Sequence, residues 1–428
     1  MTPFQYEPHG PERPGFNPAA ELRCMSCGSH SAWEDMFTGC STCAQEGSNE
    51  PIEVVYSDEL HYGPDRDQAL QLLATARQPI ATQSRVDLGR PLATPLPPLE
   101  QLGKNLFAKN ETLNPTWGHK DRLHEVDAGI ARLLQRRGVV ATSTGNHGAA
   151  AAAYASAAGL PSVIFCHPDA SPSALRMISA YGGQPVYLPR AEAHDAVARM
   201  VDDGWFPATS MDPLISGRSN PFGAEGYKIL AYEVVKQLGT CPGTVVVPTA
   251  SGDTYYGIAK GFAEAAELLD ESPARVVAAQ PANADSLVRS TKAGRLVQVD
   301  KPQSLALSIA EPITGRQALH AITRWGGDAI AVDDEDIIGA VRDLALCGLL
   351  VEPASAAALA AYRTLRERGL SSERPTVLVL TGAGVKWPGA MSAAFPGQPL
   401  QGLSQLDGYL AGLGMPISGL AAVQEGRG

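Results

Sequence analysis

The feature that most constrains this chain is a repeated alternation of short β-rich runs with longer segments of helical periodicity. The pattern predicts strands at residues 105–109, 139–142, 162–166, 244–248, 275–279, 329–332 and 376–380. Between them it predicts helices that include 225–238, 253–269, 334–347 and 354–368. Strands that alternate with helices are joined by right-handed crossovers, so we expect an α/β fold with mostly parallel sheets covered by helices.

Length and charge narrow the class of protein. The 428 residues can bury more than one core, and a formal net charge of −11 opposes a broad attraction to nucleic acid or an anionic membrane. We expect a small molecule as partner, with no nucleic acid and no membrane. The chain shows neither an apolar run of transmembrane length nor a secretory signal at its start, so a cytoplasmic location is expected.

Four of the seven cysteines form two Cys-x-x-Cys pairs, Cys24 with Cys27 and Cys40 with Cys43. This spacing is typical of a zinc ribbon, in which four thiolates surround one zinc ion and stabilise a segment too small to build a core. Four protein ligands would leave no position for a substrate, so the pattern predicts a structural zinc site. A redox pair or disulfides are the alternatives, although a reducing cytoplasm disfavours lasting disulfides.

Two junctions between a strand and a helix have the composition of anion-binding turns. Residues 143–148, STGNHG, follow one predicted strand, and their small side chains let backbone N–H groups approach a carboxylate. Residues 249–254, TASGDT, follow another strand and offer hydroxyls, one glycine and N–H groups suited to a phosphate. Either turn alone is often purely structural, but ligands of parallel sheets bind at such junctions.

Lys120 adds an amine to these two turns. Most lysines are solvated surface charges, but this one follows Pro115 and begins an amphipathic helix, where the helix dipole disfavours a cation. A neutral amine attacks aldehydes. A Schiff-base amine, a phosphate cup and a carboxylate seat are together what a pyridoxal 5'-phosphate (PLP) site requires.

Six segments in this order make the chain resemble the fold-type II PLP-dependent enzymes, and specifically the threonine synthases. They are residues 114–122 (NPTWGHKDR), 143–148 (STGNHG), 220–228 (NPFGAEGYK), 247–253 (VPTASGD), 351–356 (VEPASA) and 380–386 (LTGAGVK). The N-terminal ribbon is similar to that of the threonine synthases that carry one. The resemblance implies two mostly parallel three-layer αβα domains beside the ribbon. It implies a ribbon at 1–56, a large PLP-binding domain at 57–142 and 213–388, a smaller mobile domain at 143–212, and a tail at 389–428.

The resemblance also implies roles for individual residues. Lys120 would form the Schiff base and shuttle protons at Cα and Cβ, and Asn146 would bond the ring oxygen of the cofactor. Substrate carboxylate would lie against Ser143, Thr144 and His147, cofactor phosphate against Thr249, Ala250, Ser251, Gly252 and Asp253, and the pyridine nitrogen against Thr381. His119 stands where the family commonly has an aromatic residue; it is either a catalytic or substrate-binding group, or a packing or cofactor-lining one.

Substrate choice is the least determined property. Threonine synthases usually carry an Arg in the segment that is 304–316 here, where it holds the phosphate of O-phosphohomoserine. This chain has Ala310 or Glu311 at that place, and we expect Arg316 to bind the substrate instead. The leading hypothesis is a threonine synthase. The alternatives are a serine or threonine ammonia-lyase or β-replacement enzyme, and a zinc-ribbon binding protein without catalysis. The resemblance suggests a monomer or homodimer.

Overall fold

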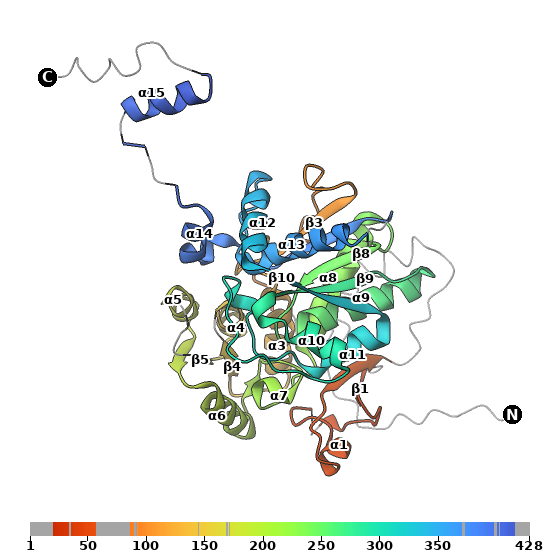
Figure 1. The fold of residues 1–428 in the computed structure, drawn as a ribbon. Coiled ribbons are helices and arrows are strands. Elements are labelled where there is room, and N and C mark those ends of the chain that lie inside the picture. The colour runs from red at the N-terminus through yellow and green to blue at the C-terminus, as the bar shows by residue number, and fades with distance from the viewer. Residues whose placement is uncertain are drawn as a thin grey trace.

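The computed structural model describes residues 20–33, 36–56, 86–89, 91, 93–143, 145–167, 170, 172–369, 373–397, 400–401 and 403–415. The larger of its sheets has the strand order β10-β9-β8-β11-β3 (Figure 1). Its strands are β3 (Leu106–Asn110), β8 (Thr244–Pro248), β9 (Arg275–Pro281), β10 (Gly327–Val332) and β11 (Thr376–Leu380). Every pair of neighbouring strands in this sheet is parallel.

The second sheet is also parallel and has the order β6-β5-β4-β7. It consists of β4 (Val139–Ser143), β5 (Ser162–Cys166), β6 (Gln184–Tyr187) and β7 (Phe206–Pro207). The predicted α/β class with mostly parallel sheets is confirmed. Because β4 pairs with β5 and β7, the smaller sheet already begins at residue 139, before the predicted domain boundary at 143. The short strands β6 and β7 were missed by the sequence pattern.

Helices cover both sheets. Their bounds are α3 (Lys120–Leu133), α4 (Asn146–Ala157), α5 (Pro172–Ala180), α6 (Arg190–Asp202), α7 (Pro213–Ser216), α8 (Gly223–Leu238), α9 (Asp253–Leu269), α10 (Ser286–Ala293), α11 (Arg316–Trp325), α12 (Asp334–Leu346), α13 (Pro353–Glu367), α14 (Pro388–Ala394) and α15 (Leu403–Gly412). None of the described helices is long and apolar enough to cross a membrane. The region predicted as a tail holds most of α14 and all of α15, and α15 lies apart from both sheets (Figure 1).

The larger sheet is the middle layer of a three-layer sandwich. Side chains of a strand point alternately to its two faces, so neighbouring residues of β8 enter different cores. Val245 and Val247 pack with α8 and α9, whereas Val246 packs with α12 and α13. Burial on both faces explains why these strands are almost continuously apolar.

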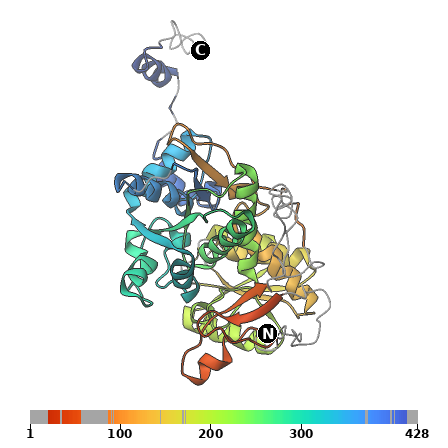
Figure 2. The same cartoon turned by 90° about the vertical axis from the view of Figure 1, so that its right-hand side faces the viewer.

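The N-terminal ribbon packs against the smaller sheet. It contains β1 (Ala20–Cys24) and α1 (Ser41–Gln45), and β1 pairs antiparallel with β2 (Ile52–Tyr56). The ring of Phe37 lies 5.3 Å from that of Phe206 and 6.2 Å from that of Phe222, centroid to centroid. The ribbon, red in Figure 2, therefore shares a core with the smaller domain and lies at the opposite end of the molecule from α15.

A buried ion network anchors the start of α3. Both carboxylates that Arg122 contacts, Glu111 and Glu233, lie within 2.8 Å of its guanidinium nitrogens. Lys109 reaches Glu233 at 2.8 Å, and three of these four side chains have no exposed surface. Buried charges persist only when they are paired, so the network joins α3 firmly to β3 and α8. It is a feature that sequence reasoning missed.

Candidate active site

A cavity lies where the carboxyl ends of strands from both sheets meet. Turns that follow β4, β8 and β11 line it, together with the first residues of α3, α4 and α9. This is the position at which parallel α/β sheets bind ligands. The lining includes the predicted Lys120, His119, Ser143, Asn146, His147, Thr249, Ala250, Ser251, Gly252, Asp253 and Thr381. Thr144 lies outside the described residues.

Lys120 is the first residue of α3, and its side chain faces the cavity. Its Nζ donates a hydrogen bond to the Tyr227 hydroxyl at 3.1 Å. The turn before it is held by Asp121, whose carboxylate accepts from the backbone N–H and the hydroxyl of Thr116 at 3.0 and 2.8 Å. Gly118 lies so close to the β11 end that an added Cβ would be 3.0 Å from the carbonyl oxygen of Thr381. These contacts direct the amine to the end of the larger sheet.

His119 is held at both ring nitrogens. Its Nδ1 lies 3.0 Å from the carbonyl oxygen of Thr381, and its Nε2 lies 3.1 Å from the Thr254 hydroxyl. The ring stacks on Tyr227 with centroids 5.5 Å apart. Burial lowers the pKa of His119 well below its usual value, so the ring is neutral, with Nδ1 donating and Nε2 accepting. This geometry favours a positioning residue over an acid or base, and the predicted catalytic role stays a prediction.

The turn after β4 is the predicted seat of the substrate carboxylate. The Ser143 hydroxyl oxygen accepts from the N–H groups of Gly145 at 3.0 Å and Gly148 at 2.7 Å, which shapes the start of α4. His147 lines the cavity, but its ring nitrogens lie 3.2 Å from Nε2 of His124 and 2.8 Å from the Ala208 carbonyl oxygen. Burial lowers the pKa of His147 to about 3. Its side chain is therefore neutral and fixed, which leaves the backbone as its means of contacting an anion.

The turn between β8 and α9 fits a phosphate. Gly252 has φ of +102°, and a Cβ there would lie 2.6 Å from the Cβ of Ala318, so only glycine fits. The carboxylate of Asp253 would repel an anion, but it accepts from the Met211 N–H at 2.8 Å and from the Ser210 hydroxyl at 3.0 Å. The hydroxyls of Thr249 and Ser251 donate to the Val247 carbonyl oxygen and to Asp253, so the backbone N–H groups at the start of α9 are what this turn offers a phosphate.

Asn146 and Thr381 also line the cavity. The Asn146 amide donates to both carboxylate oxygens of Glu352, at 3.0 and 2.9 Å, and the Thr381 hydroxyl lies 3.0 Å from that of Ser355. Glu352 is buried, and burial raises its pKa. Sequence reasoning did not assign Glu352 or Tyr227 to the site. Glu352 lies within the family segment 351–356 and Tyr227 within the family segment 220–228, and this is the signal that could have found them.

Arg316 does not lie where it was predicted to act. Its Nη1 contacts the Asp212 carboxylate at 2.7 Å, its Nε lies 3.3 Å from the Glu50 carboxylate, and it does not line the cavity. It joins the ribbon to the start of α11 instead. The arginine that does line the cavity is Arg190 at the start of α6, with Nη2 2.7 Å from the carboxylate of Glu311.

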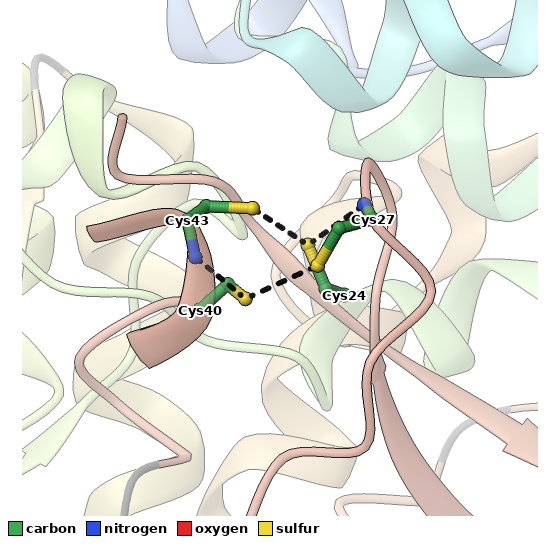
Figure 3. Close-up of side chains that lie close together, drawn as sticks. All are labelled: Cys24, Cys27, Cys40 and Cys43. Atoms are coloured by element: carbon green, nitrogen blue, oxygen red, sulfur yellow. Dashed lines mark hydrogen bonds between the residues drawn. The ribbon is translucent and has the colours of Figure 1, made fainter. Parts of the chain in front are cut away.

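The four predicted metal ligands come together in the ribbon (Figure 3). The Sγ atoms of Cys24 and Cys43 lie 3.7 Å apart, as do those of Cys27 and Cys40, and all four lie within 4.8 Å of one another. A tetrahedral ion with Zn–S bonds of about 2.3 Å would put its sulfurs about 3.8 Å apart. A disulfide needs about 2.05 Å, and all four cysteines are free. The cluster therefore has the size of a four-thiolate zinc site.

Comparison with known proteins identifies the family. A family model described as "Pyridoxal-phosphate dependent enzyme" matches residues 89–382, which is more than half of the chain. The chain belongs to this family of PLP-dependent enzymes. The prediction of a fold-type II PLP enzyme is thereby confirmed. The amine of Lys120 and the turn that contains Gly252 have the chemistry needed to hold the aldehyde and the phosphate of this cofactor.

Curated relatives of this PLP-dependent enzyme are threonine synthases. The one from Methanosarcina acetivorans is 30% identical over 380 residues, which cover 84% of this chain and 90% of the relative. The one from Methanocaldococcus jannaschii is 32% identical over 305 residues, 68% of this chain and 73% of the relative.

Solved structures show the same fold in enzymes of other names. Maize serine racemase is 22% identical with a TM-score of 0.63, over 78% of this chain and 98% of the racemase. A fungal L-serine ammonia-lyase from Rhizomucor miehei is 22% identical with a TM-score of 0.58, over 68% of this chain and 93% of the lyase. At these identities the similarity establishes the fold alone.

Proposed function

We propose that this PLP-dependent enzyme is a lyase acting on a small amino acid, and that its reaction is that of a threonine synthase. The observation that carries the proposal is the 30% identity to a threonine synthase over 90% of that relative's length. In this reaction O-phosphohomoserine and water give threonine and phosphate. The cavity supports the proposal because it combines an amine, a phosphate cup and a second anion-binding turn.

In this proposal, separate residues of the chain transfer protons, bind the substrate carboxylate and bind the cofactor phosphate. PLP, when bound through Lys120, supplies the electron sink that makes the Cα proton of the substrate acidic. The amine of Lys120 would take the Cα proton and, once it has given that proton up, a Cβ proton, while the Tyr227 hydroxyl would orient it. The turn that contains Ser143 would hold the substrate carboxylate, and the turn that contains Gly252 would hold the cofactor phosphate.

Phosphate would leave from Cγ, the protons taken would return to Cγ and Cα, and water would add at Cβ to complete the reaction. Thr381 would meet the pyridine nitrogen with a hydroxyl, a neutral partner that favours rapid elimination over a long-lived carbanion. His119 would act as a positioning residue. Its two ring nitrogens bond the Thr381 carbonyl oxygen and the Thr254 hydroxyl, so it would hold these two threonines in place next to Lys120.

A second candidate is a β-elimination on serine or threonine, as in an ammonia-lyase. The position of Arg316 favours it, since the arginine that was predicted to bind substrate phosphate is occupied by Asp212 and Glu50. Incubation with O-phosphohomoserine, homoserine, threonine and serine, while phosphate and 2-oxo acid are followed, separates the two. Phosphate with threonine supports the synthase, and 2-oxobutyrate or pyruvate without phosphate supports the ammonia-lyase. A protein that converts none of the four would contradict both.

We also propose that Cys24, Cys27, Cys40 and Cys43 hold one structural zinc ion. The sulfur separations of 3.7 Å match a tetrahedral site. Backbone N–H groups of Cys27 and Cys43 lie 3.5 and 3.4 Å from the sulfurs of Cys24 and Cys40, which stabilises thiolates. Metal analysis of freshly purified protein should find one zinc per chain, and its absence would refute the site. The cytoplasmic location and the monomeric or dimeric state stay predictions.

A further inference from the structure

A series of buried polar contacts connects α8, α3 and α4 next to the cavity. At one end, Oδ1 of Asn220 accepts from the backbone N–H of Phe222 at 3.1 Å, just before α8. The amide nitrogen of Asn220 then donates to Oδ1 of Asp127 on α3 at 2.9 Å. At the other end, Nε2 of His147 on α4 lies 2.8 Å from the carbonyl oxygen of Ala208, which follows β7. The series therefore begins and ends on the backbone.

His124 lies between these two ends. It follows Lys120 by four residues on α3, so the two side chains lie on the same face of that helix. Its Nε2 lies 3.2 Å from Nδ1 of His147. Its Nδ1 lies 3.8 Å from Oδ2 of Asp127, and this oxygen is buried without a hydrogen-bond partner among the described residues. The contact between His124 and Asp127 is therefore where the series is incomplete.

The two ends fix the direction of every hydrogen bond between them. A carbonyl oxygen only accepts, so Nε2 of His147 carries a proton and its Nδ1 accepts from Nε2 of His124. Nδ1 of a neutral His124 is then an acceptor as well. Oδ1 of Asp127 already accepts from Asn220, so Oδ2 is the atom that faces His124. Two acceptors would face each other in a buried site unless Asp127 carries a proton.

Burial favours the neutral forms of both side chains, each of which is 1% exposed. Burial raises the pKa of Asp127 well above its usual value and lowers the pKa of His124 well below its own. The amine of Lys120 further disfavours an imidazolium, and the carboxylate of Asp253 on α9 further disfavours a second carboxylate. The other titratable groups that act on the pair are His119 and His147.

We propose that Asp127 is a neutral carboxylic acid that donates to Nδ1 of His124, and that both are positioning residues for the turn that binds substrate. The inference rests on the proposed function, in which that turn holds the substrate carboxylate. Neither residue lines the cavity, so both act through His147. Because His147 lies in the first turn of α4, a fixed ring holds the N–H groups of that turn in place relative to Lys120 on α3. The acid and His124 need to approach by about 1 Å to complete the bond.

NMR spectra of the ring nitrogens, recorded on the PLP-loaded protein with ¹⁵N-labelled histidine, test the proton positions. His124 and His147 should both carry the proton on Nε2 and none on Nδ1. Their signals are assigned by their loss in His124→Gln and His147→Gln. An imidazolium at His124, or a proton on its Nδ1, would overturn the proposal.

Variants of Asp127 test the positioning role. Asp127→Leu should raise the KM for the converted amino acid about tenfold with a smaller change in kcat, since His124 loses its partner. Asp127→Asn should recover most of this loss, because its amide N–H can donate to His124 while its oxygen still accepts from Asn220. Val126→Ala, a buried change on the same helix outside the series, is the matched control and should lower Tm without raising KM. An Asp127→Asn protein as impaired as Asp127→Leu would refute the role.

The pH dependence of Tm tests the neutral acid without reference to activity. Since the pKa of Asp127 is raised in the folded protein, the wild type loses stability from this group as the pH rises above about 4. Asp127→Asn has no proton to lose at this position. Its Tm relative to the wild type should therefore rise between about pH 5 and pH 8. A difference that stays constant or falls would contradict a neutral Asp127.

The proposed function and this inference fail in different ways. If the wild-type protein converts one of the four amino acids and Asp127→Leu does so with the same KM, the positioning role is wrong and the proposed function stands. If the wild-type protein converts none of them, the proposed function is wrong, and the histidine spectra and the Tm values still decide whether Asp127 is a neutral acid.

Discussion

Replacement of Arg122 by methionine tests whether the buried ion network holds α3 and its lysine in place. Arg122 contacts Glu111 at 2.5 Å, and neither side chain is exposed. Burial alone would raise the pKa of Glu111, but the guanidinium outweighs burial and lowers it from 4.5 to about 2. That change corresponds to about 3 kcal/mol of stability. Removing one partner of a buried ion pair typically costs 3–5 kcal/mol, so we expect a loss of about 3–5 kcal/mol for Arg122→Met at pH 7.

The stability difference between the wild-type protein and Arg122→Met should also depend on pH, in a direction that follows from the pKa of Glu111. Since the pKa of Glu111 is lowered in the folded wild-type protein, its contribution is complete above pH 4.5 and is lost as the pH falls towards about 2. Without Arg122, burial raises the pKa of Glu111, so the variant regains stability when the carboxylate is protonated. The difference between the two proteins should therefore shrink between pH 7 and pH 4.5.

Urea unfolding, followed by tryptophan fluorescence and circular dichroism, measures this difference. The matched control is Arg137→Met, which removes an ion pair of 2.6 Å with Asp203 whose side chains are 62% and 63% exposed. Such a pair contributes at most about 1 kcal/mol. If Arg122→Met were no less stable than Arg137→Met at pH 7, or if its deficit grew on acidification, the network would not have the role assigned to it.

Three further changes test the site and the ribbon. Lys120→Ala should bind PLP without a covalent link, so that borohydride treatment leaves no PLP on the protein; a trapped adduct would contradict the assignment of Lys120. Tyr227→Phe removes the 3.1 Å hydrogen bond to that amine and should lower kcat about tenfold while the circular dichroism spectrum stays unchanged; an unchanged kcat would exclude an orienting role. Cys40→Ser should lose the zinc and lower Tm by several degrees, whereas Cys347→Ser, outside the cluster, should keep its metal; equal zinc in both would rule out the cluster as the site.

Most of the fold could be predicted from the sequence because the pattern of apolar residues is local. The predicted strand at 244–248 agrees with β8, and the predicted helix at 253–269 agrees with α9. The strands β6 and β7 were missed because they are short, and β6 lies mostly at the surface, where no apolar run marks it. Extended length and burial on both faces are what make a strand visible in sequence.

The sequence by itself was enough to predict the chemistry: an amine at Lys120, turns at 143–148 and 249–254 with the composition of anion-binding turns, and four cysteines with the spacing of a metal site. Each of these is a short motif whose geometry follows from neighbouring residues. The tertiary structure alone decided which charged residues meet when they lie far apart in the sequence. In it Arg316 pairs with Asp212 and Glu50, and Arg190 lines the cavity. A side chain's direction depends on the packing of distant segments, and no local pattern carries that information.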